Sequence, residues 1–290
     1  MLPGSHTGIF LALNTSGGSP ADLVYAIIDF MFPESKPEVI RDSVTFNKED
    51  FRSIEGFYRS DRYPHSDITK IIALGNTVKL NYDNGKLVSY AMGKSTTLIR
   101  TGDNSFHEKN GSDILTFRLG KNNKAEYLIL DSMPYFALEK VPAMDTPPVQ
   151  YGILILCLTL FLITVIYWPL AWLIRRGYLK SPTDEKILPL KIKIPAWLSS
   201  LLFLAFLIWF GLSLADPLEI VYAVPFSLKA GLLLPVVNVI LILTTIYYNR
   251  PVWKNIKFQF ITKIHYSMLT FSLILFEWEL YHWNLLGWNY

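Results

Sequence analysis

The chain has 290 residues, of which 51% are hydrophobic, 14% aromatic and 18% charged, so it is too apolar for an ordinary soluble domain and too aromatic for a disordered one. Its formal net charge of +3 argues against a nucleic-acid-binding protein, which gathers a larger basic surplus on one face. The single cysteine, Cys157, excludes an internal disulfide framework and a cysteine-based zinc site.

Residues 1–33 contain one predicted strand and one predicted helix. Residues 8–14 form a continuous apolar run, which is typical of a buried strand. Ser19 and Asp22 bracket a capping box with Pro20 at the first helical position, and apolar residues then recur on one helical face until Pro33. One strand and one helix are too little to bury a core. The segment is therefore predicted to be the edge of a larger α/β sheet, followed by a polar linker over residues 34–54.

Residues 55–142 are predicted to fold as an up-and-down antiparallel β-barrel. Turn signals such as Asp83-Asn84-Gly85 separate short apolar or alternating runs, as expected for successive hairpins. Eight or nine strands, spaced about ten residues apart, are typical of a small barrel. The predicted strands cover residues 57–60, 68–74, 77–82, 86–92, 96–100, 105–108, 114–119, 125–130 and 135–140.

Residues 151–290 are predicted to form a four-helix transmembrane domain. Residues 151–174, 195–215 and 230–249 contain no charged side chain, and their lengths of 24, 21 and 20 residues match the roughly 20 needed to cross hydrocarbon. A fourth candidate runs uncharged from Ile264 to Phe276 and then meets Glu277 and Glu279 among tryptophans and tyrosines. This pattern is typical of a helix that surfaces through an aromatic belt.

Basic residues predict how these helices are oriented. Ten lysines and arginines lie in residues 175–195 and 250–263, which places both loops in the cytoplasm. Residues 1–150 are then outside, although Met1 to Ser19 has no basic start and no long apolar core of the kind that defines a signal peptide. We therefore expect the chain to be the C-terminal part of a longer exported protein.

Two stretches and the order of the parts resemble a known family. The sequence GFYR at residues 56–59 opens the predicted barrel, and WNLLGW at residues 283–288 ends the predicted last helix. Together with LPGSHTGIFLALNTSGG near the start, they resemble the C-terminal region of bacterial beta-lactamase-related, penicillin-binding-protein-like serine hydrolases. The resemblance implies a catalytic domain closed by a strand and a helix, a lipocalin-like barrel, and a four-helix membrane region.

The catalytic motifs of that family are missing or misplaced. Its nucleophile lies in Ser-x-x-Lys, and no lysine of this chain has a serine three residues before it. Tyr-x-Asn occurs at residues 82–84, in a predicted hairpin, and at residues 247–249, at a predicted membrane boundary. In these places a chance match is a better explanation than a catalytic motif. His6-Thr7-Gly8 fits His-x-Gly but leads into the family's last strand instead of its catalytic one. No catalytic residue is therefore assigned.

Other polar or reactive side chains have simple structural explanations. His65 and His107 lie 42 residues apart without a ligand cluster, and Cys157 is interpreted as a small buried apolar side chain. Glu279 and His282 have the Glu-x-x-His spacing of di-iron bundles, but only one copy is present. Lys229 and Glu277 are predicted near outer helix ends, where long side chains reach water cheaply. No cofactor or metal ligand is assigned, and the roles of Glu277, Glu279 and His282 stay open.

The leading hypothesis is a noncatalytic, membrane-anchored portion of a beta-lactamase-related serine hydrolase in a bacterial cell membrane. Its partners would be the lipid bilayer and a catalytic serine hydrolase domain or peptide-like substrate, with no nucleic acid. Because Ser-x-x-Lys is missing, the chain is expected to be inactive alone. The alternative is a free-standing multi-pass membrane protein whose outer barrel binds a ligand or a partner.

Overall fold

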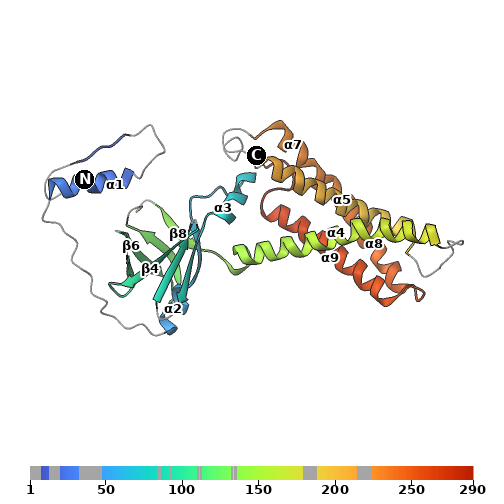
Figure 1. Cartoon of the computed structure of the whole chain (residues 1–290), viewed down its shortest axis with the longest axis horizontal. Helices are drawn as coiled ribbons and strands as arrows, with labels where there is room; N and C mark the ends of the chain where they lie inside the picture. Colours follow the sequence, from blue (N-terminus) through green and yellow to red (C-terminus); the bar gives the residue numbers. More distant parts are fainter. Residues whose placement is uncertain are drawn as a thin grey trace. The chain divides into compact units, whose positions relative to one another are not determined.

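The computed structural model describes residues 8–12, 20–32, 48–83, 86–91, 93–109, 111, 113–131, 133, 136–178, 188–213 and 224–289. The chain divides into two compact units, whose elements are labelled in Figure 1. The barrel unit comprises residues 1–61 and 78–140, and the helical unit comprises residues 62–77 and 141–290. A short segment that follows the first strand of the barrel therefore belongs to the helical unit.

The barrel unit contains a closed antiparallel barrel in which each strand pairs with its neighbours in sequence order and β1 pairs with β8. The register Tyr58↔Lys140 closes the ring, and an ion pair with 2.9 Å between Arg59 Nε and Glu139 Oε1 lies across the same two strands. The predicted class of barrel is confirmed. Its strands are β1 (Gly56–Ser60), β2 (Thr77–Asp83), β3 (Lys86–Ala91), β4 (Lys94–Arg100), β5 (Ser105–Glu108), β6 (Ile114–Leu119), β7 (Ala125–Leu130) and β8 (Ala137–Lys140).

Alternation along the strands fills the barrel with side chains. Every second residue of a strand points inward, and Tyr58, Phe106 and Phe117 contribute aromatic rings from three different strands. The ring of Phe117 lies edge-on to that of Phe106 at 5.4 Å and to that of Tyr58 at 6.1 Å. The remaining buried strand residues of this core are Leu80, Leu87, Leu98, Leu115, Ala125, Leu128 and Leu138.

A short helix completes the barrel core. The helix α2 (Lys48–Ile54) lies inside the segment predicted to be a linker, and it buries Phe51 and Ile54 among the barrel side chains. The Phe51 ring lies 4.5 Å from that of Tyr82, and the Tyr58 hydroxyl donates to the carbonyl of Ile54 at 2.5 Å. The folded barrel therefore begins at residue 48, because one helical turn places both apolar side chains on the barrel side.

One predicted strand is wrong. Residues 68–74 form the 3₁₀-helix η2 (Ile68–Ile71) and the one-turn helix α3 (Ile72–Gly75). Asp67 starts the helical turn because its carboxylate accepts from the Thr69 backbone N–H at 2.8 Å. The residues Ile68, Ile71 and Leu74 then share one face, which packs into the core of the helical unit. We call residues 62–77 the excursion, because the chain leaves the barrel after β1 and returns at β2.

The N-terminal residues differ in part from the prediction. The helix α1 (Pro20–Met31) forms as expected, with Phe30 87% exposed. The strand expected over residues 8–14 is not formed in its described part, residues 8–12, where Phe10 is 91% exposed. A strand needs a hydrogen-bonded neighbour, and these residues have none in the described part of the chain. Residues 13, 14 and 19, and with Ser19 the predicted capping box, lie outside the described residues.

The helical unit packs four long helices side by side (Figure 1). They are α4 (Pro147–Tyr178), α5 (Leu190–Ser213), α8 (Leu233–Lys254) and α9 (Phe260–His282), and the short α7 (Phe226–Gly231) precedes α8. Among the described residues, three stretches are long and apolar enough to cross a membrane: Pro147–Ile174, Leu190–Ser213 and Phe226–Lys254. The prediction of four spans is thus corrected to three, since acidic and basic side chains shorten the apolar run of α9.

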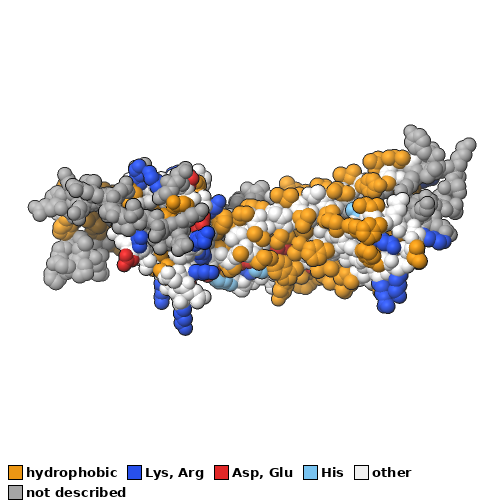
Figure 2. All heavy atoms as spheres, turned by 90° about the horizontal axis from the view of Figure 1, so that it is seen from below, with side chains coloured by type: hydrophobic (Ala, Val, Ile, Leu, Met, Phe, Trp, Pro, Cys, Tyr) orange, Lys and Arg blue, Asp and Glu red, His pale blue; other side chains and the backbone are white. Residues whose placement is uncertain are grey.

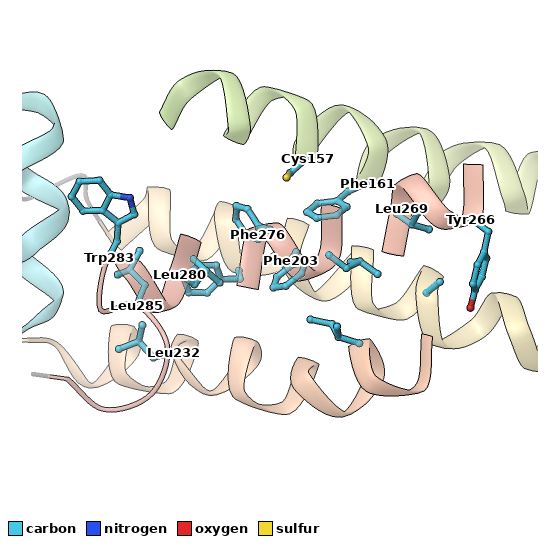
Figure 3. Close-up of a cluster of buried hydrophobic side chains, with 14 of the residues drawn as sticks. Cys157, Phe161, Phe203, Leu232, Tyr266, Leu269, Phe276, Leu280, Trp283 and Leu285 are labelled. Atoms are coloured by element: carbon cyan, nitrogen blue, oxygen red, sulfur yellow. The ribbon is translucent and has the colours of Figure 1, made fainter. Parts of the chain in front are cut away.

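Buried aromatic rings and hydrogen bonds join these helices. Phe161 of α4, Phe203 of α5 and Phe276 of α9 meet in the middle of the bundle (Figure 3), with ring separations of 4.8 to 5.7 Å. The Tyr266 hydroxyl of α9 lies 3.4 Å from the Ile192 carbonyl oxygen on α5. Helices in lipid associate through such packing and hydrogen bonding, because lipid tails give no hydrophobic drive.

The outside of the bundle is apolar. Figure 2 shows hydrophobic side chains spread over the long helices. Six aliphatic side chains on α4, α5 and α8 are between 60 and 72% exposed, and they are Ile155, Ile166, Ile208, Leu212, Ile240 and Leu243. A soluble monomer rarely exposes so continuous an apolar surface. The arrangement is compatible with insertion into a lipid bilayer.

Candidate functional site

A group of polar side chains of the helical unit lies where α9 ends and α4 begins. The 3₁₀-helix η3 (Ala143–Asp145) leads directly into α4 and brings its last residue beside the C-terminal end of α9. The excursion reaches the same place through η2. We call the group formed there the polar cluster, which consists of Lys70, Asp145, Gln150, Glu279, His282 and Trp283.

Gln150 and Trp283 fix the geometry of this end of the bundle. The indole Nε1 of Trp283 donates to Gln150 Oε1 at 2.7 Å, and Gln150 Nε2 donates to the Met144 carbonyl at 2.9 Å. Both side chains are buried, so each hydrogen bond replaces one that water would otherwise make. Trp283 points from the end of α9 into the core and lies near Leu280 and Leu285 (Figure 3).

His282 and Asp145 form the partly exposed side of the polar cluster. His282 Nε2 lies 3.0 Å from Asp145 Oδ1, and the two side chains are 25% and 15% exposed. The imidazole stacks on Trp278 at 5.3 Å and meets the Trp283 ring edge-on at 5.2 Å. The pair is thus held in place by aromatic rings while keeping some access to solvent.

Glu279 forms the buried side of the cluster. It is 7% exposed, and neither carboxylate oxygen has a hydrogen-bond partner among the described residues. Asp145 and Cys157 lie close enough to act on it electrostatically, and the Gln150 and Trp283 side chains are also its neighbours. A buried carboxyl group without a cationic partner is costly to ionise.

A turn after α9 ties the excursion to the bundle. Asn284 and Gly287 adopt left-handed backbone conformations with φ of 58° and 90°, which let the chain fold back over its own helix end. Asn284 Nδ2 donates to the His65 carbonyl at 2.8 Å, and the Asn289 carbonyl accepts from the Ile68 N–H at 2.9 Å. We call residues 283–289 together with the excursion the clasp.

Lys70 joins the clasp to the polar cluster. Its Nζ donates to the carbonyl oxygen of His282 at 2.5 Å and lies 5.7 Å from the centre of the Trp283 ring. The carbonyl groups at the end of a helix carry partial negative charge, which a lysine ammonium neutralises. The last turn of α9 is therefore bound by a side chain of the excursion.

The structure brings together only some of the residues that the sequence analysis weighed. Glu279 and His282 lie in the polar cluster, whereas Glu277 is two residues from Glu279 on the same helix with both carboxylate oxygens buried and unpartnered among the described residues. His65 takes part through its carbonyl oxygen. No group of three histidine, cysteine, aspartate or glutamate side chains within the described ranges has an arrangement that holds a metal ion.

The remaining candidates lie elsewhere. Cys157 is buried in the bundle, with its Sγ 3.6 Å from the Ser272 carbonyl, and Lys229 lies in the last turn of α7. His107 lies on β5, where its Nδ1 is 2.7 Å from the Glu108 carbonyl. Tyr82 lies on β2, Tyr247 to Asn249 lie within α8, and His6, Thr7 and Asn84 fall outside the described residues.

Sequence reasoning missed Lys70, Asp145 and Gln150. All three precede or lie outside the runs that the sequence predicts to be membrane spans, and their partners are more than 130 residues away in the chain. The WNLLGW stretch pointed to this end of the bundle but not to the excursion that it contacts. Searches against protein-family models, curated proteins and solved structures find no match for the chain. The polar cluster can therefore be interpreted only from its own chemistry.

Proposed function

We propose that the chain is a noncatalytic, membrane-anchored barrel module of the beta-lactamase-related serine hydrolases. In this proposal the barrel positions or covers a peptide-like substrate for a catalytic domain at the outer face of a bacterial membrane. The resemblance of residues 56–59 and 283–288 to that family motivates the proposal, together with the order of barrel and apolar helices.

The observation that carries the proposal is the filled interior of the barrel. An eight-stranded barrel is just wide enough either to be packed by its own side chains or to hold one small ligand. Here Tyr58, Phe106 and Phe117 occupy the centre, and Phe51 packs on from α2. In the proposal a barrel packed in this way is a rigid body that contacts the substrate or the catalytic domain through its outer surface. This supports a positioning domain over the alternative in which the barrel binds a small ligand inside.

The charge distribution along the helical unit supports the proposed orientation. Arg250, Lys254, Lys257 and Lys263 cluster around the turn between α8 and α9, with Trp253 and Tyr247 next to them. Basic residues of short loops favour the cytoplasmic side, and aromatic side chains favour the membrane boundary. The opposite end of α9 carries acidic side chains and joins the excursion. In the proposal residues 1–150 face outward.

The exposed face of α1 is where a catalytic domain would dock. Leu23, Phe30 and Met31 are 45%, 87% and 46% exposed, so the helix presents apolar side chains that a partner would cover. In the resembled family this helix closes the catalytic domain. A membrane protein that binds an unrelated partner through the same face is the second candidate function.

The test has two parts. The chain alone, in membranes, is expected to show no covalent labelling by a fluorescent penicillin or a fluorophosphonate, because it has no Ser-x-x-Lys motif. A separately expressed catalytic domain of the resembled family that lacks its own closing strand and helix is then expected to sediment with membranes only when the chain is present. The matched control is the Phe30→Asp chain, which places a charge on the docking face. With this variant in the membranes, the catalytic domain should no longer sediment. Stoichiometric labelling of the chain alone, or sedimentation that does not depend on the chain, would refute the proposal.

A further inference from the structure

The carboxyl group of Glu279 is enclosed without a counter-charge. The side chain is 7% exposed, and both of its oxygens lack a hydrogen-bond partner in the part of the chain that the structure describes. Removal from water disfavours an ionised Glu279 carboxylate, and this effect outweighs the nearby Trp283 and Gln150 side chains, which favour the ionised form. The neutral acid has no such penalty. The geometry thus favours a bound proton on this group.

The neighbouring titratable groups do not supply a positive charge to Glu279. Asp145 of η3 and Cys157 of α4 act on it electrostatically, and an ionised form of either would add negative charge. His282, on the same helix, lies 3.0 Å from the Asp145 carboxylate. The Lys70 ammonium of η2 donates to the carbonyl of His282. Glu279 also lies in the last turn of α9, the end of the helix to which the aligned peptide dipoles give partial negative charge.

We propose that Glu279 is a proton-binding site whose occupancy controls the clasp. The proton leaves the carboxyl oxygen for solvent, and the carboxylate regains a proton from solvent when the pH falls. Loss of the proton places a negative charge beside Asp145 and at the negative end of α9. The last turn of α9 then loosens, and with it Trp283 and the turn that holds the excursion. This inference does not depend on the proposed function.

Infrared spectroscopy of the full chain in detergent micelles tests the bound proton. A protonated carboxyl group has a C=O stretching band that a carboxylate lacks. We expect such a band at neutral pH and expect Glu279→Gln to remove part of it. Glu277→Gln is the control variant, because both Glu277 carboxylate oxygens are also buried without a hydrogen-bond partner among the described residues, and it should leave the Glu279 part of the band in place. A spectrum in which Glu279→Gln removes no band would overturn the proposal.

Hydrogen exchange tests the link to the clasp. After correction for intrinsic exchange rates, residues 65–72 and 283–288 of the natural chain are expected to lose protection as the pH rises from mildly acidic to mildly alkaline. In Glu279→Gln, these residues should remain as protected at alkaline pH as they are at acidic pH. In Glu277→Gln, their protection should fall with rising pH as it does in the natural chain.

Three results would overturn the link. One is a loss of protection with rising pH that survives in Glu279→Gln, and another is a loss that depends on added Mg²⁺ or Zn²⁺ instead of pH. The third is a Glu279→Gln chain that fails to fold, because the proposal requires a neutral side chain of this shape to fit.

Discussion

The helix α2 is predicted to contribute a large share of the stability of the barrel, through Phe51. The side chain is 2% exposed, and its ring lies 4.5 Å from that of Tyr82. Truncation of a buried phenylalanine to alanine costs about 3 to 5 kcal/mol, because it removes apolar contacts and leaves a cavity. A domain of this size is stable by about 5 to 15 kcal/mol. Phe51→Ala should therefore remove a third or more of the stability of a barrel near the middle of that range.

Hydrogen exchange of the full chain in detergent measures this effect locally. With a tenfold change for each 1.4 kcal/mol, the slowest amides of β1 to β8 should exchange roughly 10²- to 10⁴-fold faster in Phe51→Ala. Amides of α4, α5, α8 and α9 should not change, since they belong to the other unit. Arg52→Ala, which alters the exposed neighbour on the same helix, should leave the barrel unchanged. Equal exchange in the two variants would refute the assignment of α2 to the barrel core.

Three other predictions follow from the description of the two units. A cysteine at Lys257 should resist an impermeant maleimide in sealed cells, whereas a cysteine at Lys109 should react when an added signal peptide exports the chain. Reaction at Lys257 would contradict the proposed cytoplasmic position of residues 250–263. Burial, and secondarily Asp113, raises the pKa of Glu108, so the ionised form is disfavoured in the folded barrel. Barrel stability should fall as the pH rises above the ordinary glutamate pKa, and urea unfolding of Glu108→Gln should lack that fall. Asn284→Ala should lose two side-chain hydrogen bonds and a favourable left-handed residue, at about 1 to 3 kcal/mol, with faster exchange in the excursion as the measurement.

The barrel was predictable because its signals are local. Alternating side chains and Asp-Asn-Gly or Asn-Gly turns specify antiparallel hairpins, and eight of the nine predicted runs are strands. The ninth, residues 68–74, is an apolar run too short for its period to separate a strand from a helix. The structure of residues 68–74 depends on what they pack against. Ile68 packs into the core of the helical unit, and no local pattern in those residues predicts this contact.

The candidate site was predictable only in fragments. Glu279 and His282 attracted attention by their spacing, and Trp283 by its place in an aromatic stretch, but each was considered alone. Asp145 and Gln150 join them because η3 places the start of α4 against the end of α9. Such a meeting depends on how helices pair and not on the composition of either segment. The sequence also predicted α9 to be a fourth membrane span, but α9 is not among the stretches that are long and apolar enough to cross a membrane.

The clasp joins parts of the chain that are synthesised at very different times. Asn284 and the His65 carbonyl that it binds are separated by 219 residues, so the ribosome must synthesise all the intervening residues before the excursion meets its partner. Until then the apolar face formed by Ile68, Ile71 and Leu74 has no C-terminal turn to cover it. That interval is when chaperones or proteases have access to this face.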